Sequence, residues 1–221
     1  MLPTGRLLGS GRSADVYEID EAWVLRRDRE GWGDAAAEGA VMSYVLDHGY
    51  PVPRVRPSGS RTDLVMERLS GPTMLGALLE GSLGTEEAGT LLARLLRQLH
   101  TVPGRSADDP DVRVLHLDLH PDNVILTPDG PRVIDWTNAE DGHPGLDWGM
   151  SAVILAQVAV GGDPIAAPAR EMLTALLADP SDLTDSGLTE ARGRRAANPT
   201  MSPREVELLG AAEDLIRGLV R

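Results

Sequence analysis

The spacing of apolar residues changes near residue 70 and divides the chain into two parts. Before that point the apolar residues occur in short runs that alternate with polar ones, as in half-buried β-strands. Such runs lie in residues 5–20, where a glycine-containing turn separates two of them, and in residues 22–27 and 62–67. A helix is predicted between these strands at residues 34–47, with Asp34 as N-cap and glycine at the C-terminal end.

After Gly71 the spacing becomes that of helices. Leucines recur at helical spacing after Thr85, and residues 146–160 form an almost continuous apolar segment typical of a buried core helix. A further helix is predicted at residues 168–178, an irregular stretch at 179–200, and a last helix that begins at Ser202 with a capping box. Between them, residues 124–134 read as two short strands joined by a Pro-Asp-Gly turn.

Composition narrows the classes of protein that fit this pattern. The chain has 221 residues, no cysteine and a formal charge of −13. The missing cysteines exclude disulfides and thiolate metal sites, and the negative charge argues against nonspecific binding to nucleic acid. An acidic surface suits a cationic substrate, and the alternative is that it serves solubility alone. The first residues lack the apolar stretch of a signal peptide, and no segment is long enough to span a membrane, so we expect a soluble, cytoplasmic protein.

Candidate chemistry is concentrated in the segment HLDLHPDN at residues 116–123 and in VIDW at residues 133–136. Phosphoryl transfer needs a carboxylate that receives or orients a hydroxyl proton, and further oxygen ligands that hold Mg2+ against the phosphates of a nucleotide. Asp118 fits the first role, and Asn123 and Asp135 fit the second. Asp135 lies 12 positions after Asn123, across the predicted hairpin, which would bring the two close enough to share a metal.

The spacing of His116, Asp118 and Asn123 matches the kinase catalytic loop H-R-D-x-x-x-x-N, and a second aspartate follows the hairpin as in kinases. With His120 where protein kinases usually carry lysine, the segment resembles the aminoglycoside phosphotransferase and choline kinase branch of the protein-kinase-like fold. The resemblance implies an α+β, bilobal fold. Its small antiparallel β-sheet lobe with one helix would cover residues 1–67 and bind the nucleotide, and its mostly helical lobe would cover residues 68–221.

The same resemblance assigns nucleotide-binding roles in the first lobe. Gly9 and Gly11 occupy the first two positions of the glycine-rich loop that covers the phosphates. Arg26 stands where kinases carry the phosphate-binding lysine, which is the main departure from the protein-kinase pattern. Glu38, on the buried side of the predicted helix, is its candidate partner.

The segment around residues 65–71 resembles the kinase hinge, whose main chain holds the adenine edge. This resemblance implies that the carbonyl of Glu67 and the N–H of Leu69 contact the purine. These are main-chain contacts, so the side chains at these positions say little about the assignment.

The length of the segment after Asp135 distinguishes small-molecule kinases from regulated protein kinases. Asp147 follows Asp135 by only 12 positions, which leaves no room for the long activation segment that ends in A-P-E. The element Asp-Trp-Gly at residues 147–149 resembles the one that opens the next helix in small-molecule kinases. We expect Asp147 to anchor the backbone of the catalytic loop, and His116 to pack beneath that loop.

The sequence therefore predicts an ATP- or GTP-dependent, Mg2+-requiring phosphotransferase. Its acceptor is expected to be a hydroxyl of a small molecule such as an aminoglycoside-like antibiotic, an amino alcohol or a sugar-like metabolite, and a cationic acceptor would suit the acidic composition. Two alternatives stay open at this point. One is a protein kinase without an activation segment, as in the RIO-like branch, and the other is a nucleotide-binding pseudokinase, which the arginine at position 26 leaves in play. The sequence does not identify the acceptor, the preferred nucleotide or the oligomeric state.

Overall fold

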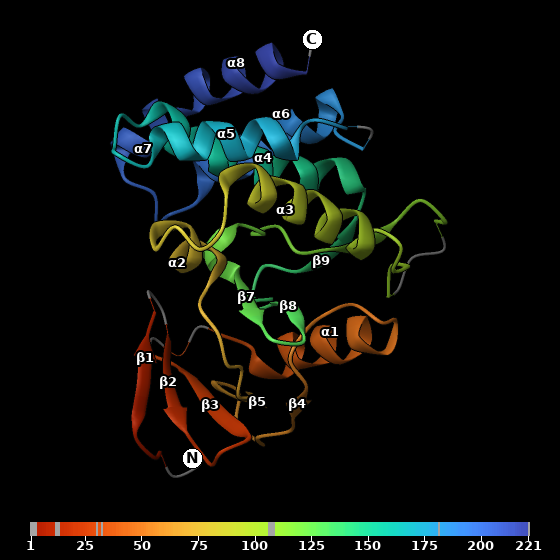
Figure 1. Ribbon diagram of the computed structural model, residues 1–221. Helices are drawn as coiled ribbons and strands as arrows, with labels where there is room; N and C mark the ends of the chain where they lie inside the picture. The colour runs from red at the N-terminus through yellow and green to blue at the C-terminus, as the bar shows by residue number, and fades with distance from the viewer. Residues whose placement is uncertain are drawn as a thin grey trace. The chain divides into compact units, whose positions relative to one another are not determined.

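The computed structural model describes residues 4–11, 14–29, 31, 33–105, 109–180 and 182–220, and Figure 1 traces it from one end of the chain to the other. It forms two compact units. The first unit comprises Met1–Gly71 and Ile125–Ala139, and the second comprises Pro72–Val124 and Glu140–Arg221. The chain thus leaves the first unit a few residues beyond the boundary expected from the sequence, and it returns there to form the hairpin that follows the HLDLHPDN segment.

The first unit is built on a five-stranded antiparallel sheet with the strand order β1-β2-β3-β5-β4. The strands are β1 (Leu7–Ser10), β2 (Ala14–Glu18), β3 (Trp23–Asp28), β4 (Val55–Arg56) and β5 (Asp63–Glu67). In the central strands Leu25 lies opposite both Tyr17 and Val65, and these residues form an apolar cluster with Trp23. The strands β1, β2, β3 and β5 lie in the segments where strands are predicted, although three consecutive residues are buried in both β3 and β5.

Helix α1 (Ala35–Asp47) begins where the sequence predicts. The carboxylate of Asp34 accepts a hydrogen bond from the N–H of Ala37 at 3.0 Å, and Gly49 adopts the left-handed conformation just after the helix end, with φ of +81°. Its buried face holds apolar residues and, among them, the carboxylate of Glu38. A buried charge on this face requires a partner, which the site provides.

The hairpin of β7 (Val124–Thr127) and β8 (Gly130–Val133) is fastened to the first unit by main-chain and aromatic contacts. The N–H of Val133 donates to the carbonyl of Pro51 at 2.8 Å, and Trp136 packs edge-to-face on Tyr50 with ring centroids 5.6 Å apart. Gly71 has φ of +144°, and a Cβ atom there would lie 1.9 Å from the carbonyl oxygen of Leu126. Only glycine fits this close approach.

The second unit is mostly helical (Figure 1). Its elements are α2 (Met74–Leu79), α3 (Thr85–Leu99), β6 (Arg113–Leu115), η1 (Pro121–Asn123), β9 (Glu140–Gly142), α4 (Pro144–Val160), α5 (Ala166–Leu176), α6 (Asp185–Ala197), α7 (Pro203–Glu207) and α8 (Leu209–Leu219). Helix α4 is buried over most of its length because α5, α6 and α8 pack around it. Across the described residues, no helix combines the length and apolar character needed to cross a membrane.

Three features of the second unit differ from the prediction. Residues 179–200 were expected to be irregular, yet α6 occupies Asp185–Ala197. The last helix begins with the predicted capping box at Ser202 but breaks at Leu208 into α7 and α8. The strands β6 and β9, which pair antiparallel, were not predicted because each has only three residues.

Helix α6 escapes prediction because glycines rather than large apolar residues form its contact with α4. A Cβ atom on Gly187 would lie 2.3 Å from the main-chain carbon and oxygen of Gly145, and one on Gly149 would lie 3.0 Å from the Cβ of Ala191. The two helices therefore approach closely over small residues, and glycine has the low helix propensity that hides the element from sequence reasoning.

The Gly187→Ala variant tests this packing. The added methyl group has no space against Gly145, so we expect the free energy of unfolding to fall by about 1–3 kcal/mol. The matched control is Gly193→Ala on the same helix, where a Cβ atom meets nothing within 4 Å and where alanine is expected to stabilise by about 0.5–1 kcal/mol. Urea denaturation of both variants measures the difference, and equal stabilities would contradict the close packing.

Candidate active site

The HLDLHPDN segment connects β6 to β7, and its last three residues form the short helix η1. The side-chain amide of Asn123 donates from Nδ2 to the carbonyl oxygen of Asp118 at 2.9 Å, and the N–H of Asn123 donates to the carbonyl of His120 at 2.9 Å. The side-chain nitrogen of Asn123 is thus already hydrogen-bonded within the loop. Its oxygen is the atom that this side chain can offer to a metal.

Two histidines of the loop, His116 and His120, lie close to Asp118. Burial alone would raise its pKa, but interactions with His120, His116 and Arg195 outweigh burial and lower the pKa below its usual value. Nε2 of His120 lies 3.8 Å from Oδ2 of Asp118, a separation at which the attraction is electrostatic rather than a short hydrogen bond. Asp118 is therefore ionised at neutral pH.

Asp147, in the first turn of α4, holds this loop by its backbone. Its carboxylate accepts hydrogen bonds from the N–H of His116 at 2.9 Å and the N–H of Leu117 at 2.7 Å, while Nε2 of His100 lies 3.1 Å away. Leu117 has φ of +62°, a conformation that costs a non-glycine residue free energy and persists only when its surroundings impose it. The anchoring expected for Asp147 is thus present, with the buried His116 beneath the loop.

The contact of His100 with Asp147 was not predicted from the sequence. It lies at the C-cap of α3, is buried, and meets Asp147 only because α3 and α4 come together in the folded unit. Burial raises the pKa of Asp147, but the hydrogen bonds from His100 and the main chain lower it more, and the net pKa lies below its usual value.

The first unit gathers a second group of predicted residues. Arg26 on β3 forms an ion pair with Glu38 on α1, and its other terminal nitrogen lies 3.6 Å from Oδ1 of Asp135. Glu38 also accepts a hydrogen bond from the N–H of Trp136 at 3.2 Å. The predicted pairing of Arg26 with Glu38 is present in the structure, and Asp135 joins it.

The conformation of Asp135 is set by its neighbours. It has φ of +64°, it accepts a hydrogen bond from the hydroxyl of Thr137 at 2.8 Å, and the buried Trp136 beside it donates from Nε1 to the carbonyl of Val133 at 3.2 Å. Burial raises the pKa of Glu38, and the nearby Arg26 offsets part of that rise. Because Glu38 accepts the hydrogen bond from the N–H of Trp136, it supports the backbone next to Asp135.

The predicted glycine-rich loop is the turn between β1 and β2. Gly9 pairs with Val16 across the two strands, and the N–H of Gly11 donates to the carbonyl of Ala14 at 2.8 Å. No side-chain atom would be displaced by a Cβ on Gly9. Residues 12 and 13 lie outside the described residues.

The predicted hinge follows β5. The side chain of Glu67 pairs with Arg54 at 3.0 Å, and the N–H of Glu67 donates to the carbonyl of Arg54 at 2.8 Å. The N–H of Arg68 donates to the carbonyl of Ala22 at 2.8 Å. These contacts hold the segment in place, and the purine contacts of Glu67 and Leu69 stay predictions.

The oxygen atoms available for a metal suit Mg2+ rather than a transition metal. In the part of the chain that the structure describes, no three His, Asp or Glu side chains gather as a ready-made metal site. Mg2+ is usually held by one or two protein oxygen ligands together with phosphate oxygens and water. The carboxylate of Asp135 and the amide oxygen of Asn123 fit that chemistry.

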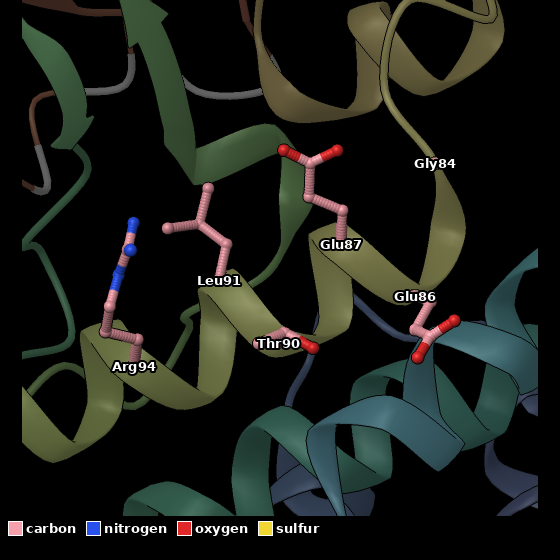
Figure 2. Close-up of a pocket in the computed structure, with 6 residues that line it drawn as sticks. All are labelled: Gly84, Glu86, Glu87, Thr90, Leu91 and Arg94. Carbon is pink, nitrogen blue, oxygen red and sulfur yellow. The ribbon is translucent and has the colours of Figure 1, made fainter.

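A hollow of about 510 Å3 lies along the exposed face of α3, apart from the predicted site residues. It is lined by Gly84, Glu86, Glu87, Thr90, Leu91 and Arg94, and Figure 2 shows Glu87, Leu91 and Arg94 pointing to the same side of the helix. The lining includes acidic side chains, one arginine and one leucine. No residue of the HLDLHPDN segment contributes to it.

The Asp147→Asn variant tests the anchor of the loop. An amide has one acceptor oxygen where the carboxylate offers two, so a buried N–H loses its partner and we expect the free energy of unfolding to fall by roughly 3 kcal/mol at pH 7.

The pH dependence of this loss has a definite sign. Because folding lowers the pKa of Asp147, its contribution is present above the unfolded pKa of about 4 and is lost as the pH falls through the folded pKa. Urea unfolding between pH 7 and acid pH should show wild type and variant converging. A stability difference that stays constant into the acid range would contradict the assignment.

Comparison with known proteins identifies the family. The family model for the phosphotransferase enzyme family matches residues 4–113 and 105–184 of the chain. No curated protein sequence matches it significantly.

The fold is shared with solved kinases at low sequence identity. A choline/ethanolamine kinase family protein from Mesorhizobium loti matches with a TM-score of 0.58 and 14% identity over 99% of this chain and 92% of that one. The ADP-bound aminoglycoside phosphotransferase APH(2'')-Ib matches with a TM-score of 0.56 and 13% identity over 97% and 93%. Amicoumacin kinase hAmiN, in complex with AMP-PNP, Ca2+ and Ami, matches with a TM-score of 0.57 and 12% identity over 96% and 87%.

These matches confirm the α+β kinase-like fold and the resemblance to the aminoglycoside phosphotransferase and choline kinase branch. They also confirm that the enzyme class is phosphotransferase. The chain belongs to the phosphotransferase enzyme family.

Proposed function

We propose that this phosphotransferase moves the γ-phosphoryl group of ATP or GTP to a hydroxyl of a small molecule. The observation that carries the proposal is the loop at residues 116–123, in which Asn123 bonds the backbone of Asp118 and Asp147 fixes the residues before it. Membership of the family supports the same reaction. The acceptor class is an aminoglycoside-like antibiotic, an amino alcohol or a sugar-like metabolite.

Asp118 is the proposed catalytic residue. Its lowered pKa makes it a weak base at neutral pH, so its main role is to accept a hydrogen bond from the acceptor hydroxyl and to orient that oxygen toward phosphorus. In a loose transition state the hydroxyl proton needs to leave only late in the reaction, which suits a weak base.

The proposed nucleotide site uses the first unit. Arg26, held by Glu38, would bind phosphate oxygens, and the loop at Gly9 and Gly11 would cover them with main-chain N–H groups. The main chain of Glu67 and Leu69 would bind the purine.

Asn123 and Asp135 are the proposed ligands of Mg2+. The ion, when bound, neutralises charge on the β- and γ-phosphate oxygens. The contact of Arg26 with Asp135, at 3.6 Å, would orient that carboxylate for the metal.

Ligands in the similar structures support a nucleotide with a divalent ion. Their descriptions name ADP for APH(2'')-Ib and AMP-PNP with Ca2+ for hAmiN, and a further match, with a TM-score of 0.56, is a streptomycin-ATP-APH(2'')-IIa ternary complex. At 12–13% identity these matches leave the preferred nucleotide and the acceptor open.

The two alternatives predict different outcomes of one assay. A protein kinase would place radiolabel from γ-labelled ATP on protein, whereas a small-molecule kinase places it on compounds of low mass. The short connection between Asp135 and Asp147, occupied by β9 and the start of α4, favours the small acceptor. A pseudokinase would bind Mg-ATP without turnover.

Replacing Asp118 by alanine tests the catalytic role. We expect kcat for acceptor-dependent ADP release to fall about 10²- to 10⁴-fold while the affinity for nucleotide is retained. The control is Asp129→Ala in the exposed turn of the β7–β8 hairpin, which should keep wild-type activity. Full turnover by the Asp118 variant would disprove the role.

Replacing Asp135 by alanine tests the metal site. Loss of one of the two proposed protein ligands should weaken Mg2+ binding. In a thermal-shift assay, ATP should therefore stabilise the variant no more with Mg2+ than with EDTA. Wild type should show a clear increase. An undiminished Mg2+ effect in the variant would exclude Asp135 as a ligand.

A further inference from the structure

The backbone at Asp135 is fixed, which leaves the rotation of its side chain as the remaining freedom. Asp135 has φ of +64°, and the N–H of the next residue, Trp136, donates to the carboxylate of Glu38 at 3.2 Å. The ring of Trp136 is buried. These contacts determine where the side chain of Asp135 leaves the backbone. They do not determine which of its two oxygens faces a bound ion.

Thr137 supplies a contact that fixes the carboxylate itself. Its hydroxyl donates to Oδ1 of Asp135 at 2.8 Å, and a terminal nitrogen of Arg26 lies 3.6 Å from the same oxygen. Both contacts therefore fall on Oδ1, and among the described residues none falls on Oδ2. The side chain of Asp135 is 43% exposed, so an ion can reach it.

The two oxygens of Asp135 thus differ in what they can offer a cation. An ion on Oδ1 would lie close to the guanidinium of Arg26, and like charges at such separations repel each other. It would also compete with the hydroxyl proton of Thr137 for the lone pairs of that oxygen. Arg26 is itself held by its ion pair with Glu38. Oδ2 is subject to neither restriction.

We propose that Thr137 is a positioning residue that restricts Asp135 to binding a divalent cation through Oδ2 alone. The inference rests on the proposed function, in which Asp135 is a ligand of Mg2+. Coordination by one carboxylate oxygen suits Mg2+, which requires nearly octahedral geometry, whereas Ca2+ also accepts both oxygens of one carboxylate. Thr137 thereby favours Mg2+ over Ca2+ at this site.

Substitution of Thr137 tests the proposal through nucleotide binding, without turnover. The dissociation constant of AMP-PNP is measured by calorimetry on the full chain with saturating Mg2+, with saturating Ca2+ and with EDTA. The affinity ratio between the two metals gives the selectivity, and the affinity of the nucleotide for each metal is the same for every protein. Thr137→Val has the shape of threonine without the hydroxyl, so it should lower the selectivity for Mg2+ about fivefold or more.

Two control variants isolate the hydroxyl. Thr137→Ser keeps it and should keep the wild-type selectivity. Thr62→Val removes a hydroxyl of the same unit that pairs with Ser60 at 3.3 Å, and it should also keep that selectivity. Wild-type selectivity in Thr137→Val overturns the proposal, and so does the same loss of selectivity in Thr137→Ser or Thr62→Val.

A crystal structure of the wild type with Mg-AMP-PNP provides a test that needs no variant. We expect the ion on Oδ2 of Asp135, with the hydroxyl of Thr137 still bonded to Oδ1. An ion on Oδ1, or on both oxygens, would overturn the proposal.

The Asp135→Ala variant, measured in the same calorimetric series, separates this proposal from the proposed function. If it loses the effect of Mg2+ on nucleotide affinity while Thr137→Val keeps the wild-type selectivity, Asp135 remains a metal ligand and only the role of Thr137 is refuted. If Asp135→Ala shows the full effect of Mg2+, Asp135 is not a ligand, and the proposed metal site and the role of Thr137 are refuted together.

Discussion

A buried carboxylate on α4 is the constraint on which the predicted catalytic loop depends. Asp147 accepts two main-chain N–H groups from consecutive residues, and one of these residues, Leu117, has a backbone conformation that it would not adopt alone. The cost of that conformation, of the order of 1–3 kcal/mol, is met by charge-assisted hydrogen bonds in a water-free setting. The loop that carries Asp118 is thus fixed by the core of its own unit.

In the first unit, too, a buried acidic side chain accepts a hydrogen bond from the backbone. Glu38 is 5% exposed, yet it is charged beside Arg26 and accepts the N–H of Trp136, the residue that follows Asp135. Asp135, like Leu117, has a positive φ angle. In each unit, therefore, a buried acid from a helix holds the backbone next to a residue with proposed chemistry. Preorganised groups of this kind need no rearrangement at the moment of reaction.

Much of this arrangement could be predicted from the sequence, because it is encoded in short spacings. The distances along the chain between His116, Asp118, Asn123 and Asp135 match a kinase pattern, and the N-cap at Asp34 places Glu38 on the buried side of its helix. Local rules of this kind survive folding because they depend on helix periodicity and turn chemistry.

The parts that escaped prediction depend on contacts between distant segments. The meeting of His100 with Asp147 requires α3 to pack near α4. The contact of Gln157 with Arg195 requires α6, whose short buried face of Gly187, Leu188 and Ala191 gives little helical signal. The proposed small-molecule kinase activity rests on the loop at residues 116–123 and not on these helices.

The most direct test of the central claim is to identify the product by mass spectrometry. The protein is incubated with Mg-ATP and a mixture of small hydroxylated compounds, and low-mass and protein fractions are analysed separately. The account predicts a phosphate monoester of one compound in the low-mass fraction, formed only when Mg2+ is present. Phosphate found only on protein, or ATP hydrolysed to free phosphate with every compound unchanged, would contradict it.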